Sequence, residues 1–190
     1  MIRAFIAVDL PEAVLKSLAD LQRELKRTGA PLRWVRPESI HLTLRFLGDV
    51  FPERIPEIQH AIGEAASRAR PFSLRPAGCG AFPSLRKMRV VWAGMEGGIA
   101  QLQDLQEDVE RAMRELGFEP EDKPFRPHLT LGRVKTQGGM APLREALVAR
   151  EGFRAEAFDV TEVVLYKSEL RPEGARYTAL FRGLLGSRPQ

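Results

Sequence analysis

The sequence predicts an α+β fold with two pseudo-symmetric lobes, each an antiparallel-rich sheet backed by two helices, and a central cleft between the sheets. Segments with helical spacing of apolar residues alternate along the 190-residue chain with short segments of strand character. The tetrapeptide His-Leu-Thr-Leu also occurs twice, at 41–44 and 128–131, so the copies lie 87 residues apart (128 − 41). Other features recur at the same offset, which indicates an internal duplication.

The first half of the chain begins with an apolar segment at 3–8 that is expected to form a strand. The next segment is expected to be a helix, because Pro11 suits a first turn and Gly29 suits the end. A further helix is expected after the first motif, over about 53–69. The inward positions of these two helices recur at helical spacing and are Val14, Leu15, Leu18, Leu21, Leu25, Ile55, Ile58 and Ile62.

The second half repeats this order. A helix is expected from near Gly98 to Gly117, and a shorter one over about 141–150 after the second motif. Segments rich in Val, Phe and Tyr are expected to form strands at 72–77, 88–93, 153–158, 162–166 and 176–181. Residues 1–190 are therefore interpreted as a single bilobal domain with an internal duplication.

The composition favours one compact, soluble monomer, because 44% hydrophobic and 28% charged residues allow a sizeable core at this length. No apolar run approaches the roughly 20 residues that span a bilayer, so no membrane association is expected and the cytoplasm is the expected location. The single cysteine, Cys79, cannot form an intrachain disulfide, and no Cys and His cluster has zinc-site spacing. Neither a metal nor a cofactor is expected.

The charge balance points mildly to an anionic partner. The chain has 29 Lys and Arg against 25 Asp and Glu, a net charge of +4, and a pI near 9.6. Arginines cluster at 68–75 and 86–89, and the planar guanidinium suits phosphate. A solvated arginine-rich surface is an equally good interpretation of these clusters.

The repeated motif carries the candidate chemistry. Alternate side chains of a strand share a face, so His41 lies beside Thr43, and His128 beside Thr130. Two imidazoles can act as an acid and base pair at neutral pH, because both protonation states of histidine persist there. If a pseudo-two-fold axis relates the lobes, the two motifs face each other across the cleft.

Three other residues are interpreted from their positions. Arg45 follows His41 and Thr43 at alternate positions of the strand, so it is expected on the same face as both of them. Tyr166 either lines the cleft or is a half-buried structural tyrosine. His60 lies in a helical segment without a hydroxyl or carboxylate at motif spacing, so a surface position is expected.

Nearly the full chain resembles the bacterial RNA 2′,3′-cyclic phosphodiesterases, also called 2′-5′ RNA ligases, of the 2H phosphoesterase superfamily. The resemblance rests on 5–11, on HLTLRFLG at 41–48, on PHLTLGR at 127–133 and on VVLYKS at 163–168. It implies hydrolysis of a terminal 2′,3′-cyclic phosphate to a 2′-phosphomonoester, and the family name implies reversible joining of 2′-5′ linked RNA ends. The partners that it implies are RNA ends or nucleotides that carry a cyclic phosphate.

The resemblance also implies the residue roles. His41 would be the proton donor and His128 the proton acceptor, and Thr43 and Thr130 would hold phosphate oxygens. The chemistry agrees, since ring opening needs a base for the attacking water and an acid for the departing ribose oxygen, with hydroxyl donors for the phosphate.

Two further residues match positions of the same family. Arg133 matches an arginine that contacts the phosphate, and Phe46 matches an aromatic that can stack on a base. Both have the opposite strand parity to the histidines, so they reach the cleft only through a twist, a bulge or the end of the strand.

Two alternatives to this function remain open from the sequence. The basic cleft could hold RNA ends without turnover, as a non-catalytic binding module. The same chemistry could also act on a small cyclic nucleotide. Activity that collapses in a His128→Ala variant, with RNA affinity retained, would identify the enzyme, and rates on mononucleotides and oligonucleotides would identify the substrate.

Overall fold

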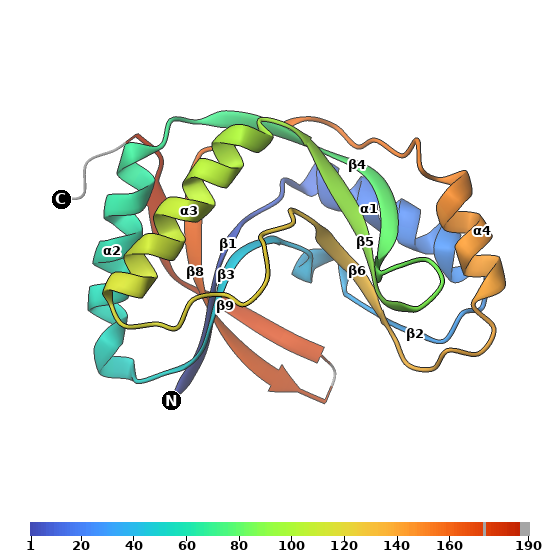
Figure 1. Ribbon diagram of the computed structural model, residues 1–190, viewed down its shortest axis with the longest axis horizontal. Helices are drawn as coiled ribbons and strands as arrows, with labels where there is room; N and C mark the ends of the chain where they lie inside the picture. The colour runs from blue at the N-terminus through green and yellow to red at the C-terminus, as the bar shows by residue number, and fades with distance from the viewer. Residues whose placement is uncertain (173, 187–190) are drawn as a thin grey trace.

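The structure is a computed structural model that describes residues 1–172 and 174–186, and it consists of two antiparallel sheets between two pairs of helices (Figure 1). The strands are β1 (Ile2–Val8), β2 (Leu32–Trp34), β3 (Leu42–Val50), β4 (Phe72–Pro83), β5 (Met88–Gly97), β6 (Leu129–Val134), β7 (Phe158–Val160), β8 (Glu162–Arg171) and β9 (Gly174–Leu184). The helices are α1 (Glu12–Lys26), α2 (Ile55–Arg68), α3 (Ile99–Glu115) and α4 (Ala141–Ala149), with short 3-10 helices η1 (Pro37–Ser39) and η2 (Pro52–Arg54).

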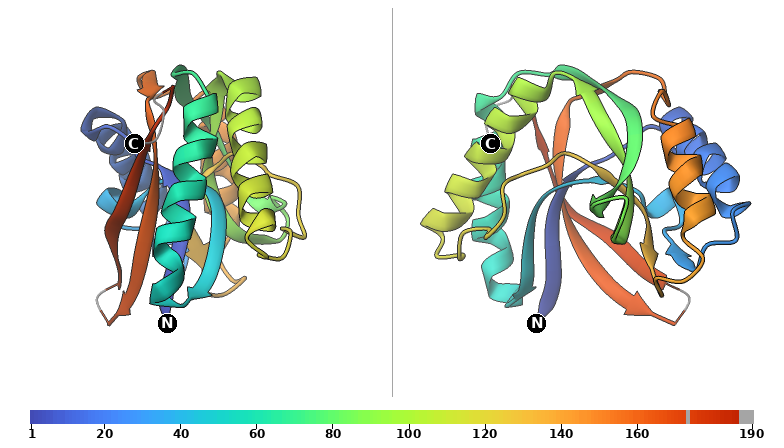
Figure 2. Two further views of the ribbon diagram at one scale, coloured as in Figure 1. Left: turned by 90° about the vertical axis from the view of Figure 1, so that its left-hand side faces the viewer. Right: turned by 45° about the vertical axis from the view of Figure 1, so that its right-hand side comes forward.

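Each sheet and its helices form one lobe. The first lobe has the four-stranded sheet β3-β1-β8-β9, with α2 and α3 on its outer side. The second lobe has the five-stranded sheet β2-β6-β5-β4-β7, with α1 and α4 on its outer side (Figure 2). The predicted α+β fold, with two helices behind each antiparallel sheet, is confirmed.

The two lobes are not the two halves of the chain. Strand β4 belongs to the first half but pairs with β5 and β7 in the second lobe, whereas β8 and β9 return to pair with β1 in the first lobe. The helices α1 and α3 also lie on the lobe opposite to the strand that precedes each of them. The long segment after α3 then crosses back to β6 (Figure 1).

The helices form because their apolar residues line one side. In α1, Val14, Leu18, Leu21 and Leu25 are buried, as their spacing predicts. The helix ends before Gly29, which has a φ of 69° that favours glycine. In the part of the chain that the structure describes, no helix is both long enough and apolar enough to cross a membrane.

One expected strand is displaced. The strand expected at 153–158 is observed as β7, which covers only Phe158–Val160. The segment before β7 is held to β4 by single hydrogen bonds, such as the one from the Ala155 N–H to the Pro76 carbonyl at 3.0 Å. Pro76 has no N–H to continue a ladder, and β4 is bulged between Pro76 and Cys79, so regular pairing stops there.

Candidate active site

A cavity of about 330 Å³ lies between the two sheets and is lined by strands of both lobes. All six residues that the sequence singled out as site residues line this one cavity: His41, Thr43, Phe46, His128, Thr130 and Arg133. The two motifs therefore meet at one site. Each histidine directly precedes its strand, and each threonine lies within it.

A bulge in β3 brings Phe46 to the cavity. Thr43 and Arg45 pair with consecutive residues of β1, so Leu44 is the extra residue of a β-bulge. After the bulge the alternation of faces is reversed, and Phe46 points to the same side as Thr43. Phe46 remains 56% exposed, so its ring is available for stacking.

A bulge at the equivalent place in β6 brings Arg133 to the cavity. Thr130 and Gly132 pair with consecutive residues of β5, and Leu131 is the extra residue. The carbonyl of Leu131 accepts a hydrogen bond from the buried side chain of Gln22 in α1, at 2.9 Å. The helix behind the sheet therefore supports the backbone that turns Arg133 towards the cleft.

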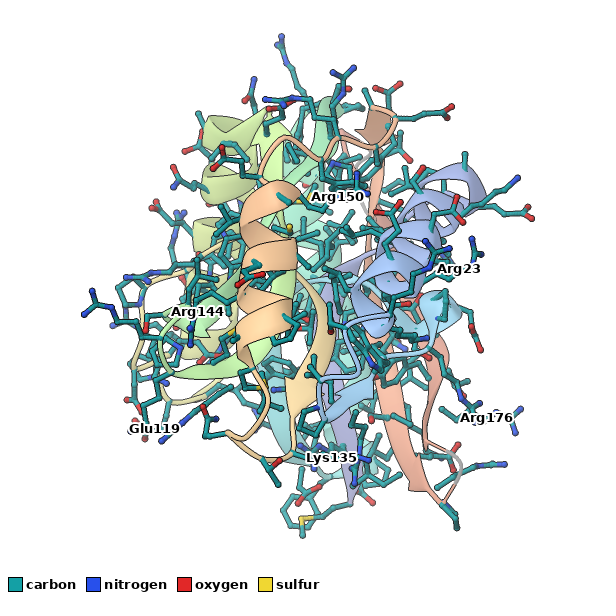
Figure 3. All side chains as sticks on the ribbon, turned by 90° about the vertical axis from the view of Figure 1, so that its right-hand side faces the viewer. Arg23, Glu119, Lys135, Arg144, Arg150 and Arg176 are labelled. Atoms are coloured by element: carbon teal, nitrogen blue, oxygen red, sulfur yellow. The ribbon has the colours of Figure 1, made fainter. Side chains whose placement is uncertain are left out.

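Simple alternation of side chains along the strand predicted the wrong face for Arg45. Arg45 is buried on the helix side of β3, because the bulge reverses its face. Its guanidinium pairs with Glu110 of α3 and with Glu121, both at 2.8 Å, and donates to the carbonyl of Glu119, which Figure 3 labels. Arg45 thus fixes the segment that leads from α3 to His128.

Both imidazoles are oriented by backbone carbonyls. The Nδ1 atom of His41 lies 2.9 Å from the Ser39 carbonyl oxygen, and that of His128 lies 2.7 Å from the Arg126 carbonyl oxygen. A carbonyl only accepts, so Nδ1 carries the proton in both rings. The Nε2 atom of each ring is then left to accept a proton when the ring is neutral and to donate one when it is charged.

The surroundings of the two rings differ. The His41 ring stacks on Phe5 at 4.6 Å between centroids and meets Tyr177 edge-on at 5.2 Å. Burial lowers the pKa of His41 below its usual value, and the hydrogen bond to Ser39 and the charge of Asp9 offset only part of this effect. The His128 ring meets Phe82 edge-on at 5.0 Å.

The cavity is suited to an anion. Two arginines, Arg3 and Arg133, line it, and no carboxylate does so among the described residues. Within residues 1–172 and 174–186, neither arginine has a carboxylate within ion-pair distance. The arginine clusters at 68–75 and 86–89 lie elsewhere, and Arg68 and Arg75 pair with carboxylates. The cavity therefore offers unpaired positive charge beside the two imidazoles.

Among the further lining residues, Arg3, Ser168 and Tyr177 bring polar side chains that the sequence analysis did not assign to the site. Tyr166 is not among the lining residues, and its hydroxyl donates to the Asp9 carboxylate at 2.5 Å, which makes it a structural tyrosine. His60 is exposed on α2, as expected.

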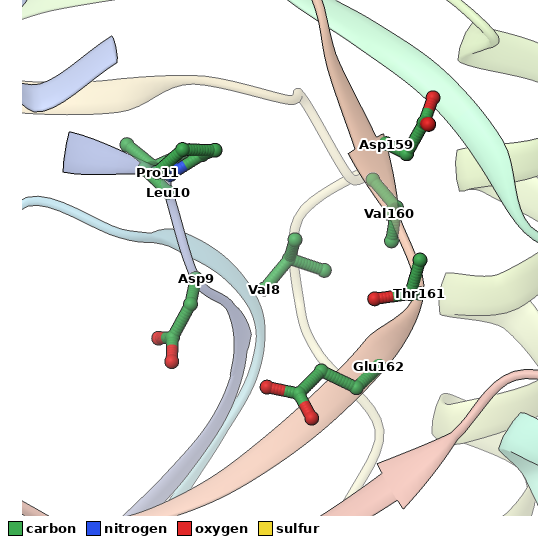
Figure 4. Close-up of a pocket in the computed structure, with 8 residues that line it drawn as sticks. All are labelled: Val8, Asp9, Leu10, Pro11, Asp159, Val160, Thr161 and Glu162. Atoms are coloured by element: carbon green, nitrogen blue, oxygen red, sulfur yellow. The ribbon is translucent and has the colours of Figure 1, made fainter. Parts of the chain in front are cut away.

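A smaller hollow of about 210 Å³ lies at the end of β1, near the turn from β7 to β8 (Figure 4). Its polar side chains include the carboxylates of Asp9, Asp159 and Glu162. Arg182 pairs with Asp9 at 3.2 Å and also with Glu162, so these two carboxylates share one guanidinium. Among the described residues, no group of three or more His, Cys, Asp and Glu side chains is placed to hold a metal ion.

The cavity can bind an oxyanion and exchange protons with it through two imidazoles, which is the equipment of an enzyme that acts on phosphate esters. A model of the LigT-like phosphoesterase family matches the chain twice, over residues 8–92 and 94–177. The chain therefore belongs to this phosphoesterase family, and the resemblance drawn from its motifs is confirmed.

Individual relatives agree with this assignment. The chain is 36% identical to an RNA 2′,3′-cyclic phosphodiesterase of Methanothermobacter thermautotrophicus, over 93% of this chain and 95% of the relative. It is also 36% identical to a Thermus thermophilus protein of the same name, over 94% and 87% of the two chains. Relatives occur in archaea as well as bacteria, which is wider than the bacterial group that the motifs suggested.

Solved structures show the same architecture. TT0787 of Thermus thermophilus is similar with a TM-score of 0.79 and 31% identity, over 97% of this chain and 98% of that chain. Escherichia coli LigT complexed with 3′-AMP is similar with a TM-score of 0.79 and 28% identity, over 98% and 99% of the two chains.

Proposed function

We propose that this protein hydrolyses the 2′,3′-cyclic phosphate at an RNA end to a 2′-phosphomonoester. The observation that carries the proposal is the pair of imidazoles on one cavity without carboxylates among its described lining residues, each with Nδ1 bonded to a carbonyl and Nε2 left for proton transfer. The names of the relatives, and the nucleotide in the Escherichia coli LigT structure, support the choice of substrate. Family membership favours an enzyme over the non-catalytic binding module.

In the proposed reaction, a water molecule attacks phosphorus while His128 accepts its proton at Nε2. The bond from phosphorus to the ribose 3′ oxygen breaks, and protonated His41 gives its Nε2 proton to that oxygen. The hydroxyls of Thr43 and Thr130 and the Arg133 guanidinium stabilise the charge on the non-bridging oxygens. Side chains supply every group that these steps require.

The same steps account for ligation. With an RNA 5′-hydroxyl as the nucleophile in place of water, the same ring opening would join two strands through a 2′-5′ linkage, and its reverse would cleave that linkage. The cyclic phosphate thereby becomes a 2′-5′ phosphodiester, and the freed 3′ oxygen becomes a hydroxyl with the proton from His41. We also propose a monomeric state and a cytoplasmic location, which the small size and single cysteine support.

The proposal is tested with a short oligoribonucleotide that ends in a 2′,3′-cyclic phosphate, incubated with the purified protein and EDTA. We expect complete conversion to the 2′-phosphate, because the acid, the base and the anion donors are all side chains. Proton–phosphorus correlation spectra distinguish the products, since the phosphate couples to the ribose H2′ or to the H3′. Substrate that stays unchanged at every pH between about 5 and 9, where histidines titrate, would refute the proposal.

A further inference from the structure

Three hydrogen-bond donors that the proposed reaction does not use form a row across the first-lobe sheet. Ser168 of β8 pairs directly with Tyr177 of β9. Ala4 of β1 pairs with Lys167, so Arg3 lies beside Ser168 on the neighbouring strand. All three side chains line the cavity, so a guanidinium and two hydroxyls from adjacent strands share one face.

This row lies one step along the sheet from the reacting groups. Arg3 and Phe5 point to the same side of β1 and are about 6.7 Å apart along the strand. The Phe5 ring stacks on His41, and the Tyr177 ring meets Phe5 at 5.0 Å and His41 at 5.2 Å. The row is therefore adjacent to the imidazole of the proposed donor.

The charges around Tyr177 also mark a place for an anion. Burial raises the pKa of the Tyr177 hydroxyl, whereas the charges of Arg133 and Arg3 lower it, so both guanidinium groups act on this hydroxyl. Both arginines are exposed at the cavity and, within residues 1–172 and 174–186, have no carboxylate partner. A negative group beside Tyr177 would meet two positive charges and two hydroxyl donors.

We propose that Arg3, Ser168 and Tyr177 form a subsite for a second phosphate, the one on the 5′ oxygen of the nucleotide that carries the cyclic phosphate. The substrate is then the end of an RNA strand, in which this phosphate links to the preceding nucleotide, and not a free cyclic mononucleotide. The inference rests on the proposed function, because it places the cyclic phosphate between His41 and His128.

The chemistry of the terminal nucleotide fits this division of the cavity. Its ribose carries three substituents: the base, the cyclic phosphate and the 5′ phosphate. Phe46 offers a stacking surface for the base, and the two motifs surround the cyclic phosphate. The Arg3 row supplies charge-assisted hydrogen bonds for the remaining group, the only other anion of the nucleotide.

The test compares two substrates that differ by one phosphate, a nucleoside 2′,3′-cyclic phosphate with and without a 5′-phosphate. For the unchanged protein, we expect the 5′-phosphate to raise kcat/KM by about 10-fold or more, as one or two hydrogen bonds between charged groups would. In the Arg3→Gln variant, we expect this advantage to fall to within about 2-fold.

Arg176→Gln is the matched control. It removes the same charge from β9, but Arg176 alternates with Tyr177 and Figure 3 shows its side chain pointing away from the body of the protein. The advantage of the 5′-phosphate should persist in this variant. Thermal unfolding of both variants checks that neither substitution of an exposed arginine disturbs the fold.

The outcomes distinguish a failure of the proposed subsite from a failure of the proposed function. If both substrates are hydrolysed equally by the unchanged protein, or if Arg3→Gln slows both by the same factor, the second-phosphate subsite is refuted while the proposed function stands. Equal slowing would assign Arg3 to the cyclic phosphate itself. If neither substrate nor the oligonucleotide is hydrolysed, the proposed function fails and the subsite fails with it.

Discussion

His128→Ala is expected to lower kcat for a terminal 2′,3′-cyclic phosphate by about 1,000-fold, because it removes the proposed acceptor of the proton of the attacking water. The fold should be retained, since His128 is only partly buried and its ring bonds to a local carbonyl. Affinity for the substrate should change little, because the proposed phosphate ligands Thr43, Thr130 and Arg133 remain in the cavity. Single-turnover rates and binding of the uncleaved substrate measure the two effects separately.

His60→Ala is the control for this loss. His60 is exposed on α2 and does not line the cavity, so its replacement should leave the rate unchanged. A His128→Ala protein that keeps a tenth or more of the activity would contradict the role of His128 as the base.

His41→Ala is expected to lower kcat on the natural substrate by about as much as His128→Ala. The rate should be recovered when sulfur replaces the bridging 3′ oxygen. A thiol has a pKa of about 8.5, so the sulfur departs as a thiolate and needs no proton donor. His128→Ala should gain no such recovery, because the attacking water still requires a base. Release of the 3′-thiol, followed with a thiol reagent, gives the rates.

The pH dependence follows from the same assignment. A donor must be protonated, so kcat/KM should fall as pH rises through the pKa of His41, which burial places below its usual value in the free protein. The sulfur substrate should lack this decline on the alkaline side. If His128→Ala recovers with the sulfur substrate and His41→Ala does not, the two histidines have the opposite roles.

The repeated motif predicted both walls of the site, because a histidine and a threonine two residues apart share a face in any strand. The strict alternation of side chains fails directly after each threonine. It placed Arg45 beside Thr43 and left Phe46 and Arg133 on the wrong face, whereas bulges at Leu44 and Leu131 reverse all three. Leucine is an ordinary strand residue, so no local signal marks a bulge there.

The helices and most strands could be predicted from periodicity, but their partners could not. Which sheet β4, β8 and β9 join depends on pairings between distant segments, and no short-range pattern encodes them. The same limit explains why Arg3, Ser168 and Tyr177 were missed. Arg3 and Tyr177 belong to no motif, Ser168 is only the last residue of the family-like segment at 163–168, and only the register of three strands brings the three side chains together.

We propose that the single bilobal domain arose by internal duplication. The two separate matches of one family model, over 8–92 and 94–177, support this origin. So does the equivalent strand order β3-β1-β8-β9 and β6-β5-β4-β7 in the two sheets. The equivalent bulges in β3 and β6 then explain why Phe46 and Arg133 enter the cavity from corresponding positions.

The proposed reaction depends on two imidazoles that act on one common phosphate. Nitrogen correlation spectra of the imidazole rings, recorded during titration with a nucleoside 2′-phosphate, test this claim directly, because the chain has only three histidines. We expect the Nε2 signals of His41 and His128 to shift together with one dissociation constant, while those of the exposed His60 stay unchanged. Shifts of only one ring, or different dissociation constants for the two rings, would contradict the shared phosphate site.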